Sequence, residues 1–115
     1  MMRNVEFCSD EIKWVQVIEA DTGCSKTILP DNLIPKSIQR NPSKIKYVTG
    51  VSGFRLKVTE TTTLNLTILG KNDKKIHSVS EILLIKRLKY GLHGRNDLIN
   101  MGLVSDLKDL CVNNT

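Results

Sequence analysis

The sequence predicts one mostly β domain spanning residues 1–115. Short segments rich in Val, Ile, Thr and Leu recur along the chain, separated by Gly, Pro, Asn and Asp, which is the pattern of strands joined by turns. Apolar residues make up 40% of the chain and charged residues 25%, which supports one folded core and excludes a disordered chain. A single short segment near the C-terminus has the spacing and the ends of a helix.

The first predicted elements are two strands and a loop. Residues 12–20 are predicted to form a strand that runs directly into Asp21, and residues 27–29 a second, short one. All three prolines of the chain fall within residues 30–42. This segment is therefore predicted to be irregular, with one helical turn at residues 32–36.

Two hairpins are predicted next. Residues 44–48 and 54–59 are the arms of the first, and the glycine-flanked tip between them is expected to be flexible. Residues 64–69 and 77–85 form the second hairpin, which is expected to lie in the core.

The predicted helix begins near Gly94 and covers residues 95–101. Leu98, Ile99 and Met101 place apolar side chains on one of its sides, and Gly102 ends it.

The cysteines and the hydropathy pattern narrow the class of protein. Cys8, Cys24 and Cys111 are an odd number without C-x-x-C spacing, which predicts free thiols instead of a disulfide framework or a zinc site. No run approaches the roughly 20 apolar residues of a membrane helix, and the N-terminal residues lack the charged-then-apolar order of a signal peptide. A cytoplasmic protein is expected.

The net charge of +5 raises the question of nucleic-acid binding, because a basic surface attracts phosphate. The basic residues are spread over predicted loops and strand ends, without the interleaved aromatic residues that stack on bases. They include Lys36, Arg40, Lys44, Lys46, Lys71, Lys74, Lys75, Lys86, Arg87 and Lys89. This distribution favours a solvated surface over a nucleic-acid site.

The first candidate catalytic group is Asp21, which a strand delivers onto a Thr22-Gly23 turn. Such a turn holds a carboxylate at a fixed angle, and the glycine lets another backbone approach closely. The triplet alone is weak evidence, because most Asp-Thr-Gly triplets are plain turns.

Three segments in the same order give the chain a specific resemblance. They are ADTGCS at residues 20–25, YVTGVSGF at residues 47–54 and LHGRN at residues 92–96. Together they resemble the retroviral-type aspartic proteases, or retropepsins, from about residue 12 to residue 104. The first segment matches the family's catalytic motif, the second its glycine-rich flap, and the third the Gly-Arg-Asn segment before its helix.

The resemblance implies a closed β-barrel or sandwich with one short C-terminal helix, acting as an aspartic endopeptidase without metal or cofactor. One Asp-Thr-Gly in a small domain is half of a two-carboxylate site, so a symmetric homodimer is needed to complete it. In aspartic proteases such a pair shares one proton. The implied substrate is a peptide or polyprotein, and the spelling of the motif resembles that of LTR retrotransposons. The expected location is then the cytoplasm or a virus-like particle.

The resemblance also implies roles for single residues. The catalytic motif is Asp21, Thr22 and Gly23, and Thr22 would support the dyad across the dimer. The implied substrate-binding residues are Cys24, Ser25, Ile28, Val48, Thr49, Gly50, Val51, Tyr90 and Leu92, and Gly94 and Arg95 are structural. For the terminal sheet that joins family dimers, residues 5–8 and 107–112 are the candidates.

Four residues depart from the family pattern. Ser25 replaces a common Asp that pairs with the family's Arg, so Arg95 needs another acceptor. Glu19 replaces an apolar residue; it favours a basic substrate side chain if it faces the cleft, and otherwise it is a solvated surface residue. His93 is expected to be a packed, hydrogen-bonded histidine, and Cys24 a small buried filler.

Two other classes remain open. One is a domesticated retropepsin-like domain that dimerises or binds peptides without cleaving them. The other is a nucleic-acid-binding β-barrel, which only the net charge supports.

Overall fold

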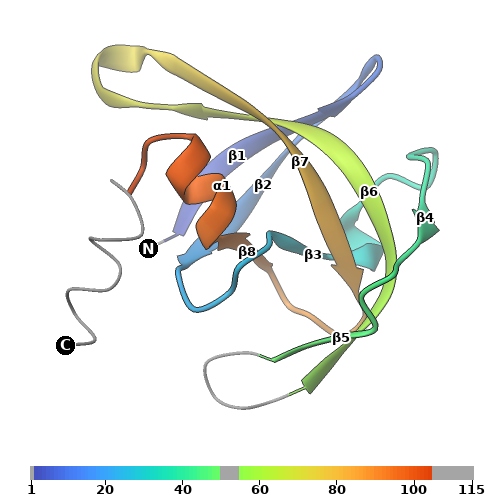
Figure 1. Ribbon diagram of the computed structural model, residues 1–115. Coiled ribbons are helices and arrows are strands. Elements are labelled where there is room, and N and C mark those ends of the chain that lie inside the picture. The colour runs from blue at the N-terminus through green and yellow to red at the C-terminus, as the bar shows by residue number, and fades with distance from the viewer. Residues whose placement is uncertain (1, 50–54, 105–115) are drawn as a thin grey trace, which may run out of the picture.

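The computed structural model describes residues 2–49 and 55–104, which form a twisted β-barrel with a short helix beside β2, β7 and β8 (Figure 1). The strands are β1 (Met2–Ser9), β2 (Ile12–Asp21), β3 (Ile28–Pro30), β4 (Asn41–Pro42), β5 (Tyr47–Thr49), β6 (Arg55–Leu69), β7 (Lys75–Ile85) and β8 (Gly91–Gly94). The helix is α1 (Arg95–Asn100), and 3-10 turns lie at η1 (Asp31–Leu33) and η2 (Lys71–Asp73). The mostly β prediction is confirmed.

Six of the described strands close into a barrel, in the order β1-β2-β8-β3-β7-β6 and back to β1. β2 pairs with β8 in parallel, and β3 pairs with β7 in parallel, whereas the other pairs are antiparallel. β4 and β5 add to β6 outside this ring. The closed barrel with one short C-terminal helix therefore agrees with the predicted architecture.

The N-terminal strand corrects one expectation. β1 pairs with β2 along its whole length, and its residues Glu6, Phe7 and Cys8 also pair with β6. Val5 and Phe7 are fully buried in the core. The alternation of apolar residues turns one face of β1 inward. Because β1 already pairs with β2 and β6 in its own chain, residues 5–8 have no role in a sheet between chains. That prediction is wrong, and residues 107–112 lie outside the described residues.

β6 is longer than predicted. Residues 54–59 and 64–69 were expected to be separate strands, but β6 runs without interruption from Arg55 to Leu69, with a register shift between Val58 and Glu60. The threonines between the two expected segments explain the continuity. Their hydroxyls donate to neighbouring backbone carbonyls, from Thr61 to Ile82 at 2.9 Å and from Thr62 to Gln39 at 2.7 Å, and their β-branched side chains suit a strand. The described parts of both predicted hairpins are present, as β5–β6 and β6–β7.

Two apolar clusters fill the molecule, and β3 and β7 separate them. On β3, Leu29 packs in the larger cluster and Ile28 in the smaller one. On β7, Ile82 and Leu84 face the larger cluster, whereas Leu83 and Ile85 face the smaller one. A strand buried on both faces needs such a continuous apolar run. The smaller cluster includes Cys24 and so lies directly beneath the segment that follows Asp21.

The helix ends as predicted. Gly102 has φ of +73°, its N–H donates to the carbonyl of Ile99, and the N–H of Leu103 donates to the carbonyl of Leu98. These two hydrogen bonds and the left-handed glycine form a Schellman cap.

The predicted helical turn at residues 32–36 is instead the 3-10 turn at Asp31–Leu33. Among the described residues no helix has the length and apolar character needed to span a membrane.

Candidate active site

The candidate site begins where β2 ends. Asp21 is the last residue of β2 and lies opposite Gly94 in the parallel pairing with β8. The N–H of Gly23 donates to Asp21 Oδ1 at 2.9 Å, and the N–H of Cys24 donates to the Asp21 carbonyl at 3.2 Å. The turn therefore orients the carboxylate through its own backbone. Asp21 is half-buried, while Thr22 and Gly23 are exposed, so the Asp-Thr-Gly motif faces outward from the single chain.

The start of α1 is tied to the segment after this turn. The N–H of Arg95 donates to the carbonyl of Cys24 at 2.7 Å, and the N–H of Asn96 donates to the carbonyl of Ser25 at 3.1 Å. Gly94 makes the close approach possible, because a Cβ at this position would lie 2.2 Å from the carbonyl carbon of Lys26. The absence of a side chain at position 94 therefore decides how α1 meets the Asp21 turn.

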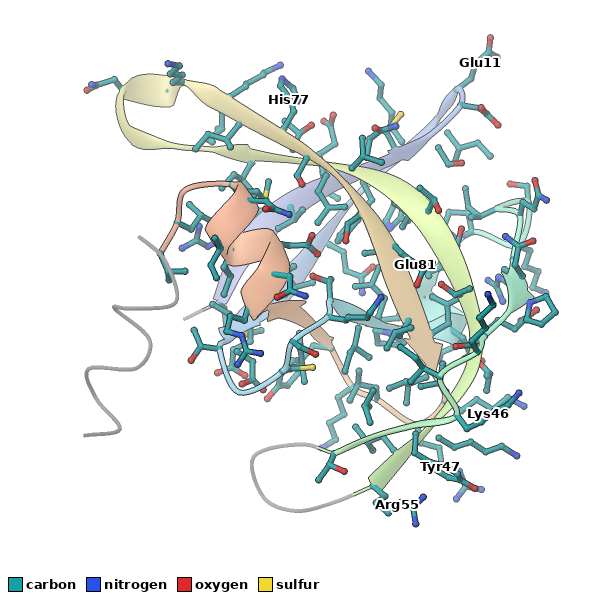
Figure 2. All side chains as sticks on the ribbon, viewed as in Figure 1. Glu11, Lys46, Tyr47, Arg55, His77 and Glu81 are labelled. Carbon is teal, nitrogen blue, oxygen red and sulfur yellow. The ribbon has the colours of Figure 1, made fainter. Side chains whose placement is uncertain are left out.

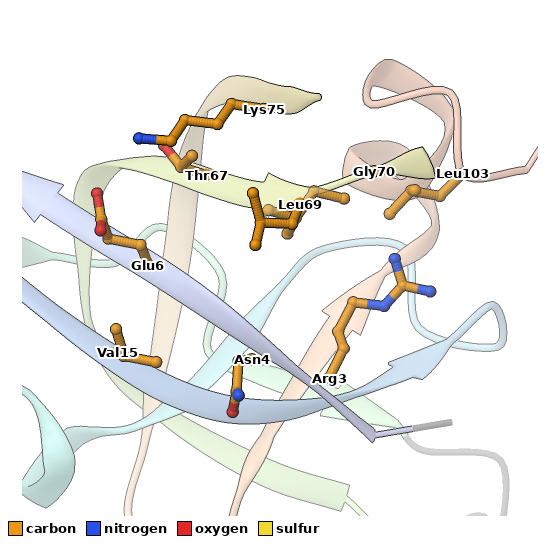
Figure 3. A pocket seen from close by; sticks show the side chains of 10 residues that line it. Arg3, Asn4, Glu6, Val15, Thr67, Leu69, Gly70, Lys75 and Leu103 are labelled. Carbon is orange, nitrogen blue, oxygen red and sulfur yellow. The ribbon is translucent and has the colours of Figure 1, made fainter. Parts of the chain in front are cut away.

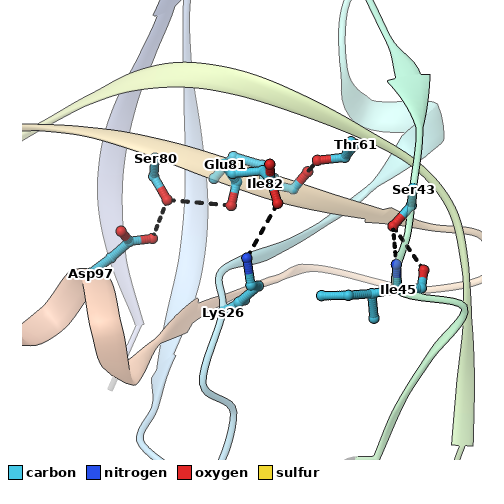
Figure 4. A network of polar contacts seen from close by, with 8 residues as sticks. All are labelled: Lys26, Ser43, Ile45, Thr61, Ser80, Glu81, Ile82 and Asp97. Atoms are coloured by element: carbon cyan, nitrogen blue, oxygen red, sulfur yellow. Dashed lines mark hydrogen bonds and ion pairs between the residues drawn. The ribbon is translucent and has the colours of Figure 1, made fainter.

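A buried carboxylate that was not singled out from the sequence supports the same contact. Asp97 is 5% exposed, and its Oδ2 accepts a hydrogen bond from the hydroxyl of Thr27. The same oxygen accepts a second hydrogen bond, from the hydroxyl of Ser80 at 2.6 Å (Figure 4). Thr27 Oγ1 in turn accepts the N–H of Gly94 at 3.0 Å. This chain of hydrogen bonds joins α1, β7 and the end of the Asp21 turn. An Asp in the first turn of a helix is a common surface feature, so its burial had no local sequence signal.

Cys24 is a packed thiol beneath the turn. It is 6% exposed, and its Sγ donates to the carbonyl of Lys26 at 3.1 Å. Burial raises the pKa of this thiol, and the nearby Asp21 carboxylate raises the pKa further. The neutral thiol therefore acts as a small buried filler, as the sequence predicted.

A cavity of about 340 Å³ opens beside the Asp21 turn. Its walls come from the turn and from β5, and it is lined by Gly23, Cys24, Ser25, Lys26, Ile45, Tyr47, Val48, Thr49, Leu83 and Arg95. The cavity brings together four of the predicted substrate-binding residues, namely Cys24, Ser25, Val48 and Thr49. Arg55 lies over the ring of Tyr47 at 4.2 Å from its centroid and braces the outer wall (Figure 2).

The remaining predicted substrate-binding residues are placed elsewhere. Ile28 is buried in the smaller apolar cluster, and Leu92 packs against that cluster from β8. Tyr90 is exposed just before β8. Gly50 and Val51, the predicted apex of the flap, lie outside the described residues.

A larger cavity, of about 840 Å³, lies away from this site between β1, the end of β6 and the segment after α1 (Figure 3). Arg3, Leu69 and Leu103 are among its lining residues. None of the predicted catalytic or substrate-binding residues lines it. Within the described ranges, no group of His, Cys, Asp and Glu side chains has the arrangement of a metal site.

The comparisons with known proteins agree with this geometry. The sequence profile of the retroviral aspartyl protease family matches residues 12–104, which is most of the chain. The chain belongs to the retroviral aspartyl protease family. Among solved structures, EIAV protease in complex with the inhibitor HBY-793 superposes with a TM-score of 0.62 and 16% sequence identity, over 89% of this chain and 88% of that one. At this identity the likeness shows the fold alone. A search of curated proteins gave no match.

The structure shows where Glu19 and His93 lie, two of the residues that depart from the family pattern. Ile18 is fully buried, and the alternation along β2 places Glu19 on the opposite face of the strand. His93 is 0% exposed, and neither ring nitrogen has a hydrogen-bond partner in the described part of the chain. The expected packing of His93 is therefore present, but its expected hydrogen bond is not. Burial lowers the pKa of this histidine and favours the neutral ring.

Proposed function

We propose that the chain is one protomer of a homodimeric aspartic endopeptidase, in which each of the two chains contributes its Asp21 to a catalytic dyad. The observation that carries the proposal is the Asp21 turn at the end of β2, where Gly23 orients the carboxylate. The turn faces outward and borders a half-open cavity. A second copy related by a two-fold axis would complete such a site.

The mechanism follows from placing two carboxylates side by side. Two carboxyl groups in contact do not both ionise, because their negative charges would repel, so the dyad holds one proton. The ionised carboxylate takes a proton from a water molecule, and the water oxygen attacks the scissile carbonyl carbon. The protonated carboxylate donates a hydrogen bond to the carbonyl oxygen and stabilises its developing charge. The carboxyl that took the water proton then gives it to the amide nitrogen, so the C–N bond breaks and the amine leaves. The Gly23 N–H donates to Oδ1 and so fixes the orientation of each carboxylate.

The substrate proposed is a peptide segment of a polyprotein, with β5 as one wall of its binding cleft. A retroelement source, of the LTR-retrotransposon kind, and a location in the cytoplasm or in a virus-like particle are proposed with it, on the family resemblance alone.

Cleavage of a peptide library at mildly acidic pH tests the proposal. The parent chain should cleave a subset of peptides, and Asp21→Asn should abolish cleavage because an amide cannot act as the general base. Asp10→Asn is the matched control, since this exposed residue lies in the β1–β2 turn and makes the same chemical change away from the site. Equal cleavage by the parent and Asp21→Asn would refute the assignment. Absence of cleavage by a dimeric parent would instead support a domesticated, non-cleaving domain.

The shared site has a separate test. Specific activity should fall on dilution as the dimer dissociates, and sedimentation should show the same transition over the same concentrations. A monomer with full specific activity at every dilution would contradict the proposed dyad.

A further inference from the structure

The cavity beside the Asp21 turn has an uneven charge. Two of its lining residues, Lys26 and Arg95, are cationic, and none of its lining residues is acidic. A third cation, Arg55, lies over the ring of Tyr47 on the outer wall. Clefts lined by charge of one sign attract ligand groups of the other sign, and their low-dielectric walls strengthen this attraction.

Arg95 supplies a guanidinium that the described protein does not neutralise. Its backbone N–H holds the carbonyl of Cys24, but its side chain makes no hydrogen bond or ion pair within residues 2–49 and 55–104. The nearby Ser25, which also lines the cavity, has a hydroxyl and no charge. Arg95 is half-buried. A partly desolvated guanidinium with no anionic partner favours a ligand that brings a carboxylate.

Lys26 supplies a second cation that is only loosely held. Its Nζ lies 3.2 Å from Glu81 Oε1, and the two side chains are 37% and 55% exposed (Figure 4). An ion pair this exposed is weak, so it does not prevent Lys26 from turning to another carboxylate. Glu81 competes for Lys26 but does not line the cavity.

We propose that this cavity is a subsite for an acidic side chain of the peptide substrate, with Lys26 and Arg95 as the residues that select it. The proposal rests on the proposed function and names the class of substrate that the site prefers. Glu19, which would favour a basic side chain if it faced the cleft, is not among the residues that line this cavity. A peptide with Glu or Asp at the position that enters the cavity is therefore cleaved in preference to the same peptide with Gln or Asn.

The experiment compares peptides that differ only by Glu or Gln at each position near the cleaved bond. The parent chain should show a higher kcat/KM for Glu at one position, by up to about fivefold for one partly screened charge pair. Lys26→Glu should reverse this preference. Glu81→Gln should increase it, because it frees Lys26. Lys13→Glu, the same charge change on exposed β2 near the β1–β2 turn, should leave the preference unchanged.

Binding provides a readout that does not need catalysis. Fluorescently labelled Glu and Gln peptides are titrated against Asp21→Asn, alone and combined with Lys26→Glu, and the ratio of their dissociation constants is measured. A Glu preference that Lys26→Glu removes supports the acidic subsite even if no peptide is cleaved, in which case only the proposed function fails. Cleavage or binding with an unchanged Glu-to-Gln ratio in Lys26→Glu overturns the subsite and leaves the endopeptidase assignment in place.

Discussion

Gly94 provides the sharpest test of how the site is assembled, through the substitution Gly94→Ala. A Cβ at position 94 would lie 2.2 Å from the carbonyl carbon of Lys26, 2.5 Å from its oxygen and 2.6 Å from the nitrogen of Thr27. All three are backbone atoms, so no side chain can rotate away. Because carbon atoms in contact prefer about 3.5–4.0 Å, β8 and the Asp21 turn must separate by about 1 Å or more.

The cost of that separation can be worked from the contacts. It weakens the hydrogen bonds from the Gly94 N–H to Thr27 and from the Arg95 N–H to the Cys24 carbonyl. Two such bonds contribute about 1 kcal/mol each, and overpacking adds about 1–3 kcal/mol, so the expected loss is about 3–5 kcal/mol. A domain is stable by only about 5–15 kcal/mol in total. Gly94→Ala should therefore lose a large part of its stability together with the geometry of Asp21.

Urea unfolding, followed by the fluorescence of Trp14, measures the loss. Trp14 is a suitable probe because it stacks on the fully buried Phe7. The matched control is Gly102→Ala, since a Cβ there meets nothing within 4 Å and only the φ of +73° is strained. That strain costs about 1–2 kcal/mol. If Gly94→Ala unfolds at the same urea concentration as Gly102→Ala, the steric reasoning is refuted.

Three further predictions concern buried polar groups. Asp97→Ala leaves the hydroxyls of Thr27 and Ser80 without their acceptor and should lower the free energy of unfolding by about 2–4 kcal/mol; a urea midpoint equal to the parent's would contradict this. Asp21→Asn removes one cause of the raised pKa of Cys24, so in a chain without the other cysteines the pH profile of Cys24 alkylation should move to lower pH. An unmoved profile would mean that the carboxylate does not act on the thiol. The folded-state pKa of His93 lies below its ordinary value of 6.5, so the stability it contributes is present above that pH and is lost as the pH falls. Urea titrations at about pH 7 and about pH 5 should therefore show a smaller loss of stability for His93→Leu than for the parent, and an equal loss would show that His93 is not responsible.

Patterns within a few residues predicted the elements that hold the motif. The apolar run before Asp21 indicated the strand that delivers it, and the glycine after the last apolar helical residue indicated the end of α1. Both depend on local backbone preferences, which a short window of sequence contains. The same is true of the turn between β6 and β7.

Interactions between distant residues were not predictable in this way. Thr27 and Asp97 are 70 residues apart, and nothing near either of them indicates a buried hydrogen bond. The continuity of β6 depends on hydroxyls that reach carbonyls of β7 and of the segment before β4, and the place of residues 5–8 depends on β6 closing the barrel against β1. The missing hydrogen bond of His93 was not predictable for a similar reason. The barrel interior buries its ring, and no neighbouring group among the described residues forms a hydrogen bond with it.

The closed ring of strands also bears on when activity appears. β1 pairs with β6 at Glu6–Cys8, so the ring of strands closes within one chain, without a second copy. Folding and assembly are then separate equilibria, and only assembly depends on concentration. On the proposed function, a folded protomer carries half of the catalytic pair. Activity would then rise with the concentration of copies, so a local increase in their density would start cleavage.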